Sequence, residues 1–135
     1  MADETAGVSK GKVLIVDDDK FLLDMYALKF KVNGFDVMTG LGGKDAFAKL
    51  EGGYVPDIIL FDIAMPGMDG PEFLAAVREK GFAPQATVVA LSNQNEPADI
   101  EKCKSLGAAE YLIKATMTPQ ELIDRVIQIV SEHKK

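Results

Sequence analysis

The sequence predicts an α/β fold in which a parallel sheet of five strands is covered by helices on both faces. Two observations support this prediction. Short, largely apolar runs alternate five times with segments of helical periodicity, and such runs are typical of strands buried on both faces. A repeated strand–helix order favours parallel strands joined by right-handed crossovers. The 135 residues are enough for one domain with its own core.

Five segments are expected to form the strands. Each is short and rich in apolar or β-branched residues, and none is long enough for a typical helix. The three stronger candidates are Val13–Val16, Ile58–Phe61 and Thr87–Leu91, and the two weaker ones are Phe35–Thr39 and Glu110–Ile113.

The helices are expected between these strands, and local signals mark their ends. The first, Lys20–Val32, has apolar residues at Leu22, Met25, Leu28 and Val32, which are spaced as on a helix, and it stops at Asn33-Gly34. Proline opens the third helix and an asparagine is expected to cap the fourth. Thr118 and Glu121 form a capping box before the last. The four later helices are expected at Lys44–Leu50, Pro71–Lys80, Asn95–Leu106 and from Thr118 to about Ser131.

Composition narrows the classes of function. The net charge is −6 and the pI is about 4.7, and Lys or Arg residues cluster only at the end, in 133–135, so a nucleic-acid partner is not expected. No apolar run approaches the roughly 18 residues of a membrane helix. The N-terminus lacks the apolar core of a signal peptide. The one cysteine, Cys103, cannot form an internal disulfide or a cysteine-based zinc site, which favours a cytoplasmic location.

The predicted domain occupies residues 12–131. Residues 1–11 are small and polar and are expected to be a disordered lead-in. Residues 132–135 are expected to be a frayed tail. The short stretch after the last helix favours a stand-alone protein.

Polar side chains follow four of the predicted strands. Asp17-Asp18-Asp19 comes after the first strand, Asp62 after the third, Ser92 after the fourth and Lys114 after the fifth. The carboxyl ends of parallel strands share one edge of the sheet, where the ligand crevice of such folds lies. These side chains are therefore expected to meet, although they are far apart in the sequence.

Such a set has a definite chemistry. Carboxylates held together repel one another unless a cation joins them, and Mg²⁺ binds one or two carboxylates together with waters and phosphate oxygens. A lysine and a hydroxyl can bind the other oxygens of a phosphoryl group, whose transfer depends mainly on positioning and charge neutralisation. A carboxylate such as Asp62 can be the nucleophile and form an aspartyl-phosphate.

Four sequence blocks resemble the signatures of response-regulator receiver domains. They are VLIVDDD (13–19), DIILFDIAMPGMDG (57–70), VALS (89–92) and GAAEYLIK (107–114). The resemblance covers residues 12 to about 131. It implies the flavodoxin-like (βα)5 fold, a three-layer sandwich with strand order 2-1-3-4-5, which is the order of chemotaxis receivers.

The resemblance also implies a role for each site residue. Asp62 stands at the phosphoacceptor position. Mg²⁺, or Mn²⁺ in its place, would be bound by Asp18, Asp62 and the backbone carbonyl of Ala64, with Asp17 acting through water. Lys114 would pair with Asp62 and later with the phosphoryl group, and Ser92 would bind a phosphoryl oxygen. Tyr111 matches the aromatic residue that swings inward as the hydroxyl at Ser92 moves.

The implied function is that of a signalling switch and not of an enzyme acting on a separate substrate. A sensor histidine kinase, a histidine phosphotransfer protein or a small phosphodonor would supply the phosphoryl group. The fourth helix, fifth strand and fifth helix would bind a downstream protein, and the chain would be a monomer or a phosphorylation-dependent homodimer. In the last helix, Leu122, Val126 and Ile129 would face the core, whereas Ile127 would lie at the rim and join Tyr111 in the partner-binding face.

Two other functions remain open from the sequence. Asp17-x-Asp19 after an apolar strand resembles the nucleophile motif of haloacid-dehalogenase-type phosphatases, with Asp17 as nucleophile and Asp19 as acid. A pseudo-receiver that binds partners without phosphorylation is the second alternative. The chain also departs from the receiver pattern: Ala115 replaces the proline that usually follows the lysine, and Asn93 stands where a small residue is common. We predict a trans Lys114–Ala115 peptide, because a cis bond without proline costs about 2.5–4 kcal/mol.

Overall fold

The structure is a computed structural model and describes residues 10–93 and 97–133. It confirms the predicted alternation of strands and helices, with boundaries that differ by at most two residues. Most of the disordered lead-in predicted for residues 1–11 lies outside the described residues. Asn95, which is predicted to cap the fourth helix, also lies outside them. The elements are β1 (Lys12–Asp17), α1 (Lys20–Val32), β2 (Asp36–Leu41), α2 (Gly43–Glu51), β3 (Ile58–Asp62), α3 (Gly70–Lys80), β4 (Thr87–Ser92), α4 (Pro97–Ser105), β5 (Glu110–Ile113), a 3-10 turn (Lys114–Thr116) and α5 (Pro119–His133).

The five strands form one parallel sheet in the order β2-β1-β3-β4-β5, as the family resemblance implies. Its register determines which strand ends are neighbours. Asp62 at the end of β3 lies opposite Leu91 of β4, and Ser92 at the end of β4 lies opposite Ile113 of β5. The carboxyl ends of the central strands and of β5 therefore meet at one edge of the sheet.

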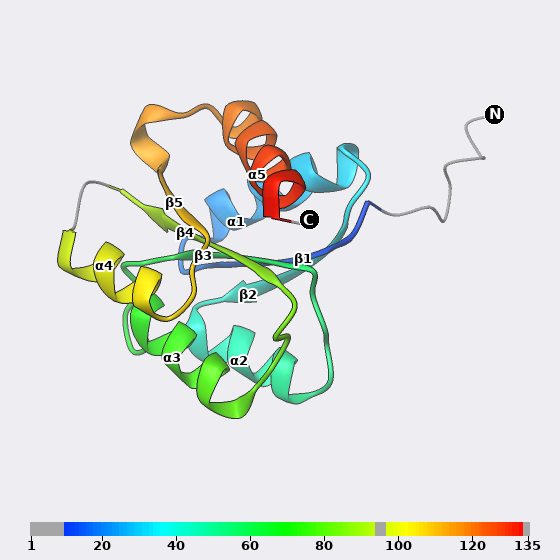
Figure 1. Cartoon of the computed structure of the whole chain (residues 1–135). Helices are drawn as coiled ribbons and strands as arrows, with labels where there is room; N and C mark the ends of the chain where they lie inside the picture. The colour runs from blue at the N-terminus through cyan, green and yellow to red at the C-terminus, as the bar shows by residue number, and fades with distance from the viewer. Residues whose placement is uncertain (1–9, 94–96, 134–135) are drawn as a thin grey trace.

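Helices cover both faces of the sheet and give three layers. Figure 1 shows α1 and α5 on one face and α2, α3 and α4 on the other. Each face has its own apolar core, because strand residues alternate between the two sides. Leu60 and Val89 contribute to the core under α1 and α5, whereas Phe61 and Ala90 contribute to the core under α2, α3 and α4. The sheet thus holds the strand ends between two packed layers.

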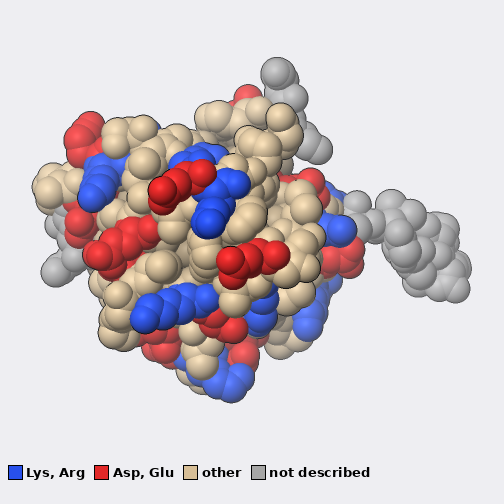
Figure 2. All heavy atoms as spheres, turned by 90° about the horizontal axis from the view of Figure 1, so that it is seen from below, with Lys and Arg blue, Asp and Glu red and all other residues tan. Residues whose placement is uncertain are grey.

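Among the described residues, no helix is both long and apolar enough to span a bilayer. Figure 2 shows the molecule from below, where acidic and basic side chains are interspersed. That face therefore carries no extended patch of a single charge.

The buried face of α1 differs from the apolar positions that predict the helix. Leu23, Tyr26, Ala27 and Phe30 are buried, whereas Leu28 and Val32 are exposed. Both sets have helical spacing, and at about 100° per residue they lie on opposite sides of the helix. The predicted helix is confirmed, but its periodicity could not identify which apolar side faces the sheet.

Capping hydrogen bonds determine where three helices begin. The Asp19 carboxylate accepts a hydrogen bond from the backbone N–H of Leu22 at the start of α1. The capping box of Thr118 and Glu121 is present before α5, as predicted. A second one, between Asp69 and Glu72, starts α3 and was not predicted. These bonds satisfy backbone donors that a helix leaves unpaired at its N-terminus.

The last helix is longer than predicted and buries a wider face. It continues to His133, two residues beyond Ser131, and Nδ1 of His133 lies 3.0 Å from the carbonyl oxygen of Ile129. The predicted core residues Leu122, Val126 and Ile129 are buried, and so is Ile123. Ile127 is half-buried and packs against this core, so it lies at the rim, as predicted.

Candidate functional site

Three aspartates meet at the carboxyl ends of β1 and β3. Asp17 and Asp62 are the last residues of these strands and are buried, whereas Asp18 is the exposed residue that follows β1. One carboxylate oxygen from each aspartate lies within 4.8 Å of one carboxylate oxygen from each of the other two. The sequence prediction that these distant residues converge is therefore confirmed.

Lys114 reaches the same place from β5. It is the first residue of the turn after that strand, and its side chain is buried. Its Nζ lies 3.1 Å from Oδ2 of Asp17 and 3.4 Å from Oδ1 of Asp62. The lysine thus pairs with both carboxylates, whereas the family resemblance pointed only to Asp62. No peptide bond among the described residues is cis, so the predicted trans Lys114–Ala115 bond is confirmed.

Burial and charge oppose each other at this site. Burial raises the pKa of Asp62 to about 6; the Lys114 ammonium opposes this rise, and the charge of Asp17 adds to it. Burial by itself would lower the pKa of Lys114, but the carboxylates of Asp62 and Asp17 together raise it. Lys114 is therefore held as an ammonium, and Asp62 carries a charge that its surroundings only partly compensate.

The donor set fits a hard divalent cation. Oδ1 of Asp62 is buried and accepts no hydrogen bond from the described residues. Oδ1 of Asp17 accepts one from the backbone N–H of Asp19 at 2.9 Å, which holds that carboxylate in place. Mg²⁺ in proteins prefers one or two carboxylates and keeps several of its waters. The clustered carboxylates match this preference, because Asp18 is exposed and leaves the site open to water. The expected role of the Ala64 carbonyl remains a prediction; Ala64 is exposed and lies two residues beyond Asp62.

The two expected switch residues lie on β4 and β5, whose carboxyl ends share an edge of the sheet with this cluster. Ser92 ends β4 and is buried, one residue beyond Leu91, which lies opposite Asp62. Tyr111 on β5 is half-buried and packs against the core under α2, α3 and α4. The ammonium of Lys104 on α4 lies 5.6 Å from the centre of the Tyr111 ring, a distance at which cations are attracted to aromatic faces.

Sequence reasoning missed two residues near the site. Gly70 begins α3, and a Cβ there would lie 2.7 Å from Cα of Ile63 and 2.8 Å from the carbonyl oxygen of Asp62. Tyr26 of α1 is buried; burial raises the pKa of its phenol, with Lys114 opposing the rise and Asp17 adding to it. Its phenol therefore shares the electrostatic environment of the cluster. Gly70 is the last residue of the block 57–70, but that block assigned it no role, and Tyr26 lies in none of the four blocks.

The geometry does not favour the alternative in which Asp17 and Asp19 act as a nucleophile and an acid. Asp19 is exposed, and its carboxylate caps α1. Asp17 is the carboxylate closest to Lys114, and its other oxygen holds the backbone of Asp19. Asp62 is the buried carboxylate with an oxygen that accepts no hydrogen bond, so it is the better candidate for a nucleophile.

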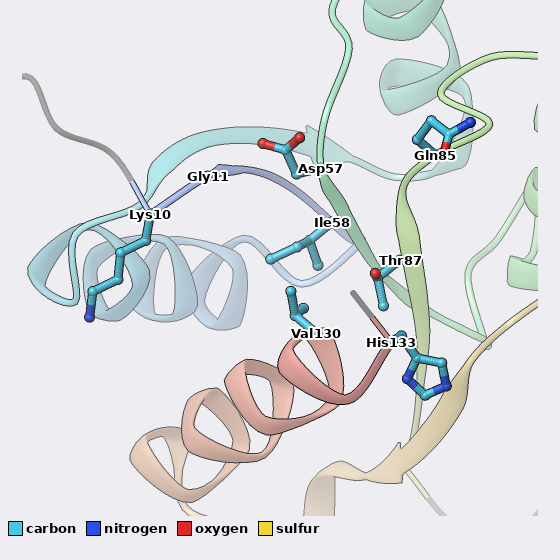
Figure 3. Close-up of a pocket in the computed structure, with 8 residues that line it drawn as sticks. All are labelled: Lys10, Gly11, Asp57, Ile58, Gln85, Thr87, Val130 and His133. Carbon is cyan, nitrogen blue, oxygen red and sulfur yellow. The ribbon is translucent and has the colours of Figure 1, made fainter. Parts of the chain in front are cut away.

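A cavity of about 520 Å³ lies elsewhere, at the amino ends of β1, β3 and β4 and the end of α5 (Figure 3). This edge of the sheet is opposite to the aspartate cluster, and none of the residues that line it belongs to the cluster. The cavity therefore has no part in the chemistry of the three aspartates. Its lining residues are Lys10, Gly11, Asp57, Ile58, Gln85, Thr87, Val130 and His133.

Replacing Asp62 by asparagine is expected to stabilise the fold at neutral pH in the absence of divalent cations. Because the pKa of Asp62 is 3.8 unfolded and about 6 folded, its ionisation disfavours the folded state once the pH exceeds about 4. Its contribution to the free energy of unfolding falls between pH 4 and 6 and stays low above pH 6. Asp62→Asn should therefore raise the free energy of unfolding by about 1–3 kcal/mol at pH 7.5 and leave it almost unchanged near pH 3.5.

Urea denaturation in EDTA at the two pH values measures this effect. Glu101→Gln is the matched control, because Glu101 is an exposed carboxylate on α4, and it should change stability by less than about 0.5 kcal/mol. Equal stabilities of wild type and Asp62→Asn at pH 7.5 would show that the charge of Asp62 is fully compensated.

Comparison with known proteins identifies the family of the chain. Residues 13–127 match the family model of the response regulator receiver domain. The Vibrio cholerae chemotaxis protein CheY4 is 30% identical, with 87% of this chain and 97% of that chain covered and a TM-score of 0.78. The N-terminal domain of a response regulator/sensory box/GGDEF 3-domain protein from Carboxydothermus hydrogenoformans is 35% identical, with 91% and 96% covered and a TM-score of 0.77.

A third similar structure is the signal receiver domain of the putative response regulator NarL from Mycobacterium tuberculosis. It is 27% identical to this chain, and the match covers 91% of this chain and 98% of that chain with a TM-score of 0.77. The family match spans most of the chain, and the strand order and the strand-end residues are those that the family resemblance implied. The chain therefore belongs to the family of response regulator receiver domains.

Proposed function

We propose that this chain is a response regulator receiver domain that accepts a phosphoryl group on Asp62 in a Mg²⁺-dependent reaction and thereby switches a partner-binding surface. The observation that carries the proposal is the position of Asp62. It is a buried carboxylate at a strand end, grouped with Asp17 and Asp18 and 3.4 Å from the Lys114 ammonium. The proposal includes a cytoplasmic location and a signalling role instead of turnover of a separate substrate.

The reaction would be a displacement at phosphorus. A carboxylate oxygen of Asp62 forms the new P–O bond while the bond from phosphorus to the donor breaks, either to a histidine nitrogen of a kinase or phosphotransfer protein or to the leaving oxygen of a small acyl phosphate. The donor's leaving group keeps the electron pair of the broken bond and takes its proton from water or from its own protein. Burial keeps the Asp62 nucleophile poorly solvated, and Lys114 offers a positive charge to the transferred group.

Mg²⁺ would be bound by Asp18, Asp62 and the carbonyl of Ala64, with Asp17 acting through water. A bound Mg²⁺ would neutralise phosphoryl oxygens and lower the repulsion between them and the carboxylates. The Ser92 hydroxyl, buried at the end of β4, would donate a hydrogen bond to a phosphoryl oxygen. Lys114 would exchange its contact with Asp62 for one with the phosphoryl group.

The output surface would consist of α4, β5 and α5. Movement of Ser92 toward the phosphoryl group would free space for Tyr111, whose ring now lies beside Lys104. Inward rotation of Tyr111 would break that contact and change the surface next to α4. Phosphorylation would in this way bias an equilibrium between two arrangements. Ile127 would be a minor member of this surface, because it is half-buried against the core.

Phosphorylation of Asp62→Asn tests the proposal. Wild type incubated with Mg²⁺ and acetyl phosphate, or with a phosphorylated histidine-phosphotransfer domain, is expected to gain one phosphoryl group, and Asp62→Asn is expected to gain none. Intact-mass spectrometry measures this. Asp19→Asn is the control, since Asp19 caps α1, and it should retain phosphorylation. Labelling of Asp62→Asn, or loss of labelling in Asp19→Asn alone, would contradict the assignment; the latter would favour a phosphatase-like use of Asp17 and Asp19.

A further inference from the structure

Lys104 of α4 and Tyr111 of β5 make a contact that lies outside the phosphorylation site. Lys104 is in the last turn of α4 and is exposed, and its Nζ lies 5.6 Å from the centre of the Tyr111 ring. An ammonium over an aromatic ring at this distance is attracted by the negative charge of the ring face. The contact therefore stabilises the ring of Tyr111 in its present position.

No neighbouring carboxylate determines where the Lys104 ammonium lies. Within residues 10–93 and 97–133, Lys104 belongs to none of the ion pairs, whereas the buried Lys114 pairs with two aspartates. The Tyr111 ring is thus the charged group's partner in the described part of the chain. Lys102 is also exposed on α4, but only Lys104 has a ring contact among the described residues, so Lys102 is a natural control for Lys104.

Arg78 holds the end of the helix that carries Lys104. From the last turn of α3, its Nε donates a hydrogen bond to the carbonyl oxygen of Leu106 at 2.7 Å, and its Nη2 donates one to that of Gly107 at 3.3 Å. These carbonyls directly follow α4, where a helix leaves acceptors without partners. The planar guanidinium binds both at once. The carboxyl end of α4 is therefore tied to α3.

Gly107 makes this grip possible and also fixes the backbone of Lys104. Its φ is +97°, and a Cβ there would lie only 2.7 Å from Nη2 of Arg78. The backbone N–H of Gly107 donates to the carbonyl oxygen of Lys104 at 3.0 Å and closes the last turn of α4. Glycine is the residue that adopts this conformation without strain. The backbone of Lys104 is thus held from both sides, and mainly its side chain is free to move.

We propose that Arg78 and Lys104 form a latch that holds Tyr111 in its present position and opposes the switch. The latch rests on the proposed function in one respect, because the movement that it opposes is the inward rotation of Tyr111. That rotation separates the ring from the ammonium, and Lys104 cannot follow as long as Arg78 holds the end of α4. The contact is therefore made in one arrangement only, and a contact of this kind biases the equilibrium between the two. At an exposed site it favours the present arrangement by about two- to fivefold.

Relaxation-dispersion NMR of ¹³C-labelled tyrosine rings in the full chain tests the latch, because it measures minor arrangements that exchange within microseconds to milliseconds. The chain has three tyrosines, and Tyr111→Phe identifies the signal of Tyr111. Wild type with Mg²⁺ and acetyl phosphate provides the ring signal of the switched arrangement.

Lys104→Met is expected to raise the population of that arrangement about two- to fivefold without any phosphodonor. Methionine keeps the unbranched stem and removes the charge. Lys104→Arg retains a cation and should remain within about 1.5-fold of wild type. Lys102→Met is the matched control on the same helix and should also leave the Tyr111 population unchanged.

Arg78→Met tests whether the grip on α4 acts through Lys104. It is expected to raise the switched population of Tyr111 as well, whereas Lys80→Met, in the same turn of α3, should not. The double variant of Arg78→Met and Lys104→Met should exceed the larger single effect by less than about 1.5-fold, because both changes remove one contact. A merely structural role of Arg78 would not produce this lack of additivity.

Three results would overturn the latch. The first is a Tyr111 population that Lys104→Met leaves at the wild-type value, and the second is an equal rise in Lys102→Met. The third is a double variant in which the effects of Arg78→Met and Lys104→Met multiply, since Arg78 would then act independently of Lys104. Failure of Asp62 phosphorylation is distinguishable from these results, because Lys104→Met and Lys104→Arg would still differ in the ring exchange of the unmodified protein.

Discussion

Replacing Lys114 by methionine is expected to lower the free energy of unfolding by about 3–5 kcal/mol at pH 8 without divalent cations. Lys114 is the cation paired with both buried carboxylates, at 3.1 Å from Asp17 and 3.4 Å from Asp62. Methionine retains the volume of the side chain and removes the charge, so two buried aspartates would face each other without compensation. Removal of one partner from a buried ion pair is costly for this reason.

The pH and Mg²⁺ dependence of this loss identifies its cause. Without the Lys114 ammonium the pKa of Asp62 should rise further above 6, since that ammonium lowers it in the wild type. At pH 5 Asp62 would then be protonated in the folded state, and the loss of stability should be smaller than at pH 8. Saturating Mg²⁺ should restore a large part of the loss by supplying another cation that binds only the folded state.

Urea denaturation at pH 5 and pH 8, with EDTA or with Mg²⁺, measures these differences. Lys20→Met is the control, because Lys20 pairs with Asp24 at 3.0 Å on the surface, where such a pair contributes at most about 1 kcal/mol. If Lys114→Met and Lys20→Met lost similar stability at pH 8, Lys114 would not be compensating the buried aspartates.

Gly70→Ala is expected to slow phosphorylation of Asp62 by about 100-fold and to cost about 1–3 kcal/mol of stability. A Cβ at Gly70 would lie 2.7 Å from Cα of Ile63, 2.8 Å from the carbonyl oxygen of Asp62 and 2.9 Å from the Phe61 ring. Two of these neighbours are backbone atoms, which cannot rotate away. Either α3 or the end of β3 must therefore move, and movement of β3 displaces the proposed nucleophile.

Phosphorylation kinetics with acetyl phosphate, together with urea denaturation, would measure both effects. Gly52→Ala is the matched control. Gly52 follows α2 with φ −77°, and the atom nearest to an added Cβ is 3.4 Å away, so the substitution should be almost neutral. A wild-type rate in Gly70→Ala would mean that the end of β3 tolerates a shift of α3 without moving Asp62.

The sequence was sufficient to predict the sheet and the residues at its carboxyl edge. The apolar runs ending in Asp17, Asp62 and Ser92 identify strands and, through their regular alternation with helices, a parallel sheet. Parallel strands end at one edge, so residues separated by 97 positions, such as Asp17 and Lys114, could be expected to meet. This inference needs only the period of the pattern and the direction of the strands.

Contacts within the site depended on the tertiary structure. Lys114 lies between two carboxylates, and which of them it approaches more closely depends on the path of the turn after β5. The close approach of Gly70 to the end of β3 also has no local signal, because glycine can follow a capping residue for many reasons. Both features arise from the packing of α3 and β5 against β3 and β4, and this packing involves residues distant in sequence.

The orientation of α1 also separates what the sequence predicts from what only the tertiary structure decides. Its sequence alone determined that a helix runs from Lys20 to Val32, because the chain has helical spacing and a stop signal at Asn33-Gly34. The sequence did not determine which side is buried, since apolar residues with helical spacing lie on two opposite sides. Only packing on the sheet decided it: the side with Tyr26 and Phe30 fits against the strands and α5, and the side with Leu28 and Val32 is left at the surface. A periodic pattern specifies a helix but not the partner of each face, because partner choice depends on the shape of a surface made by the rest of the chain.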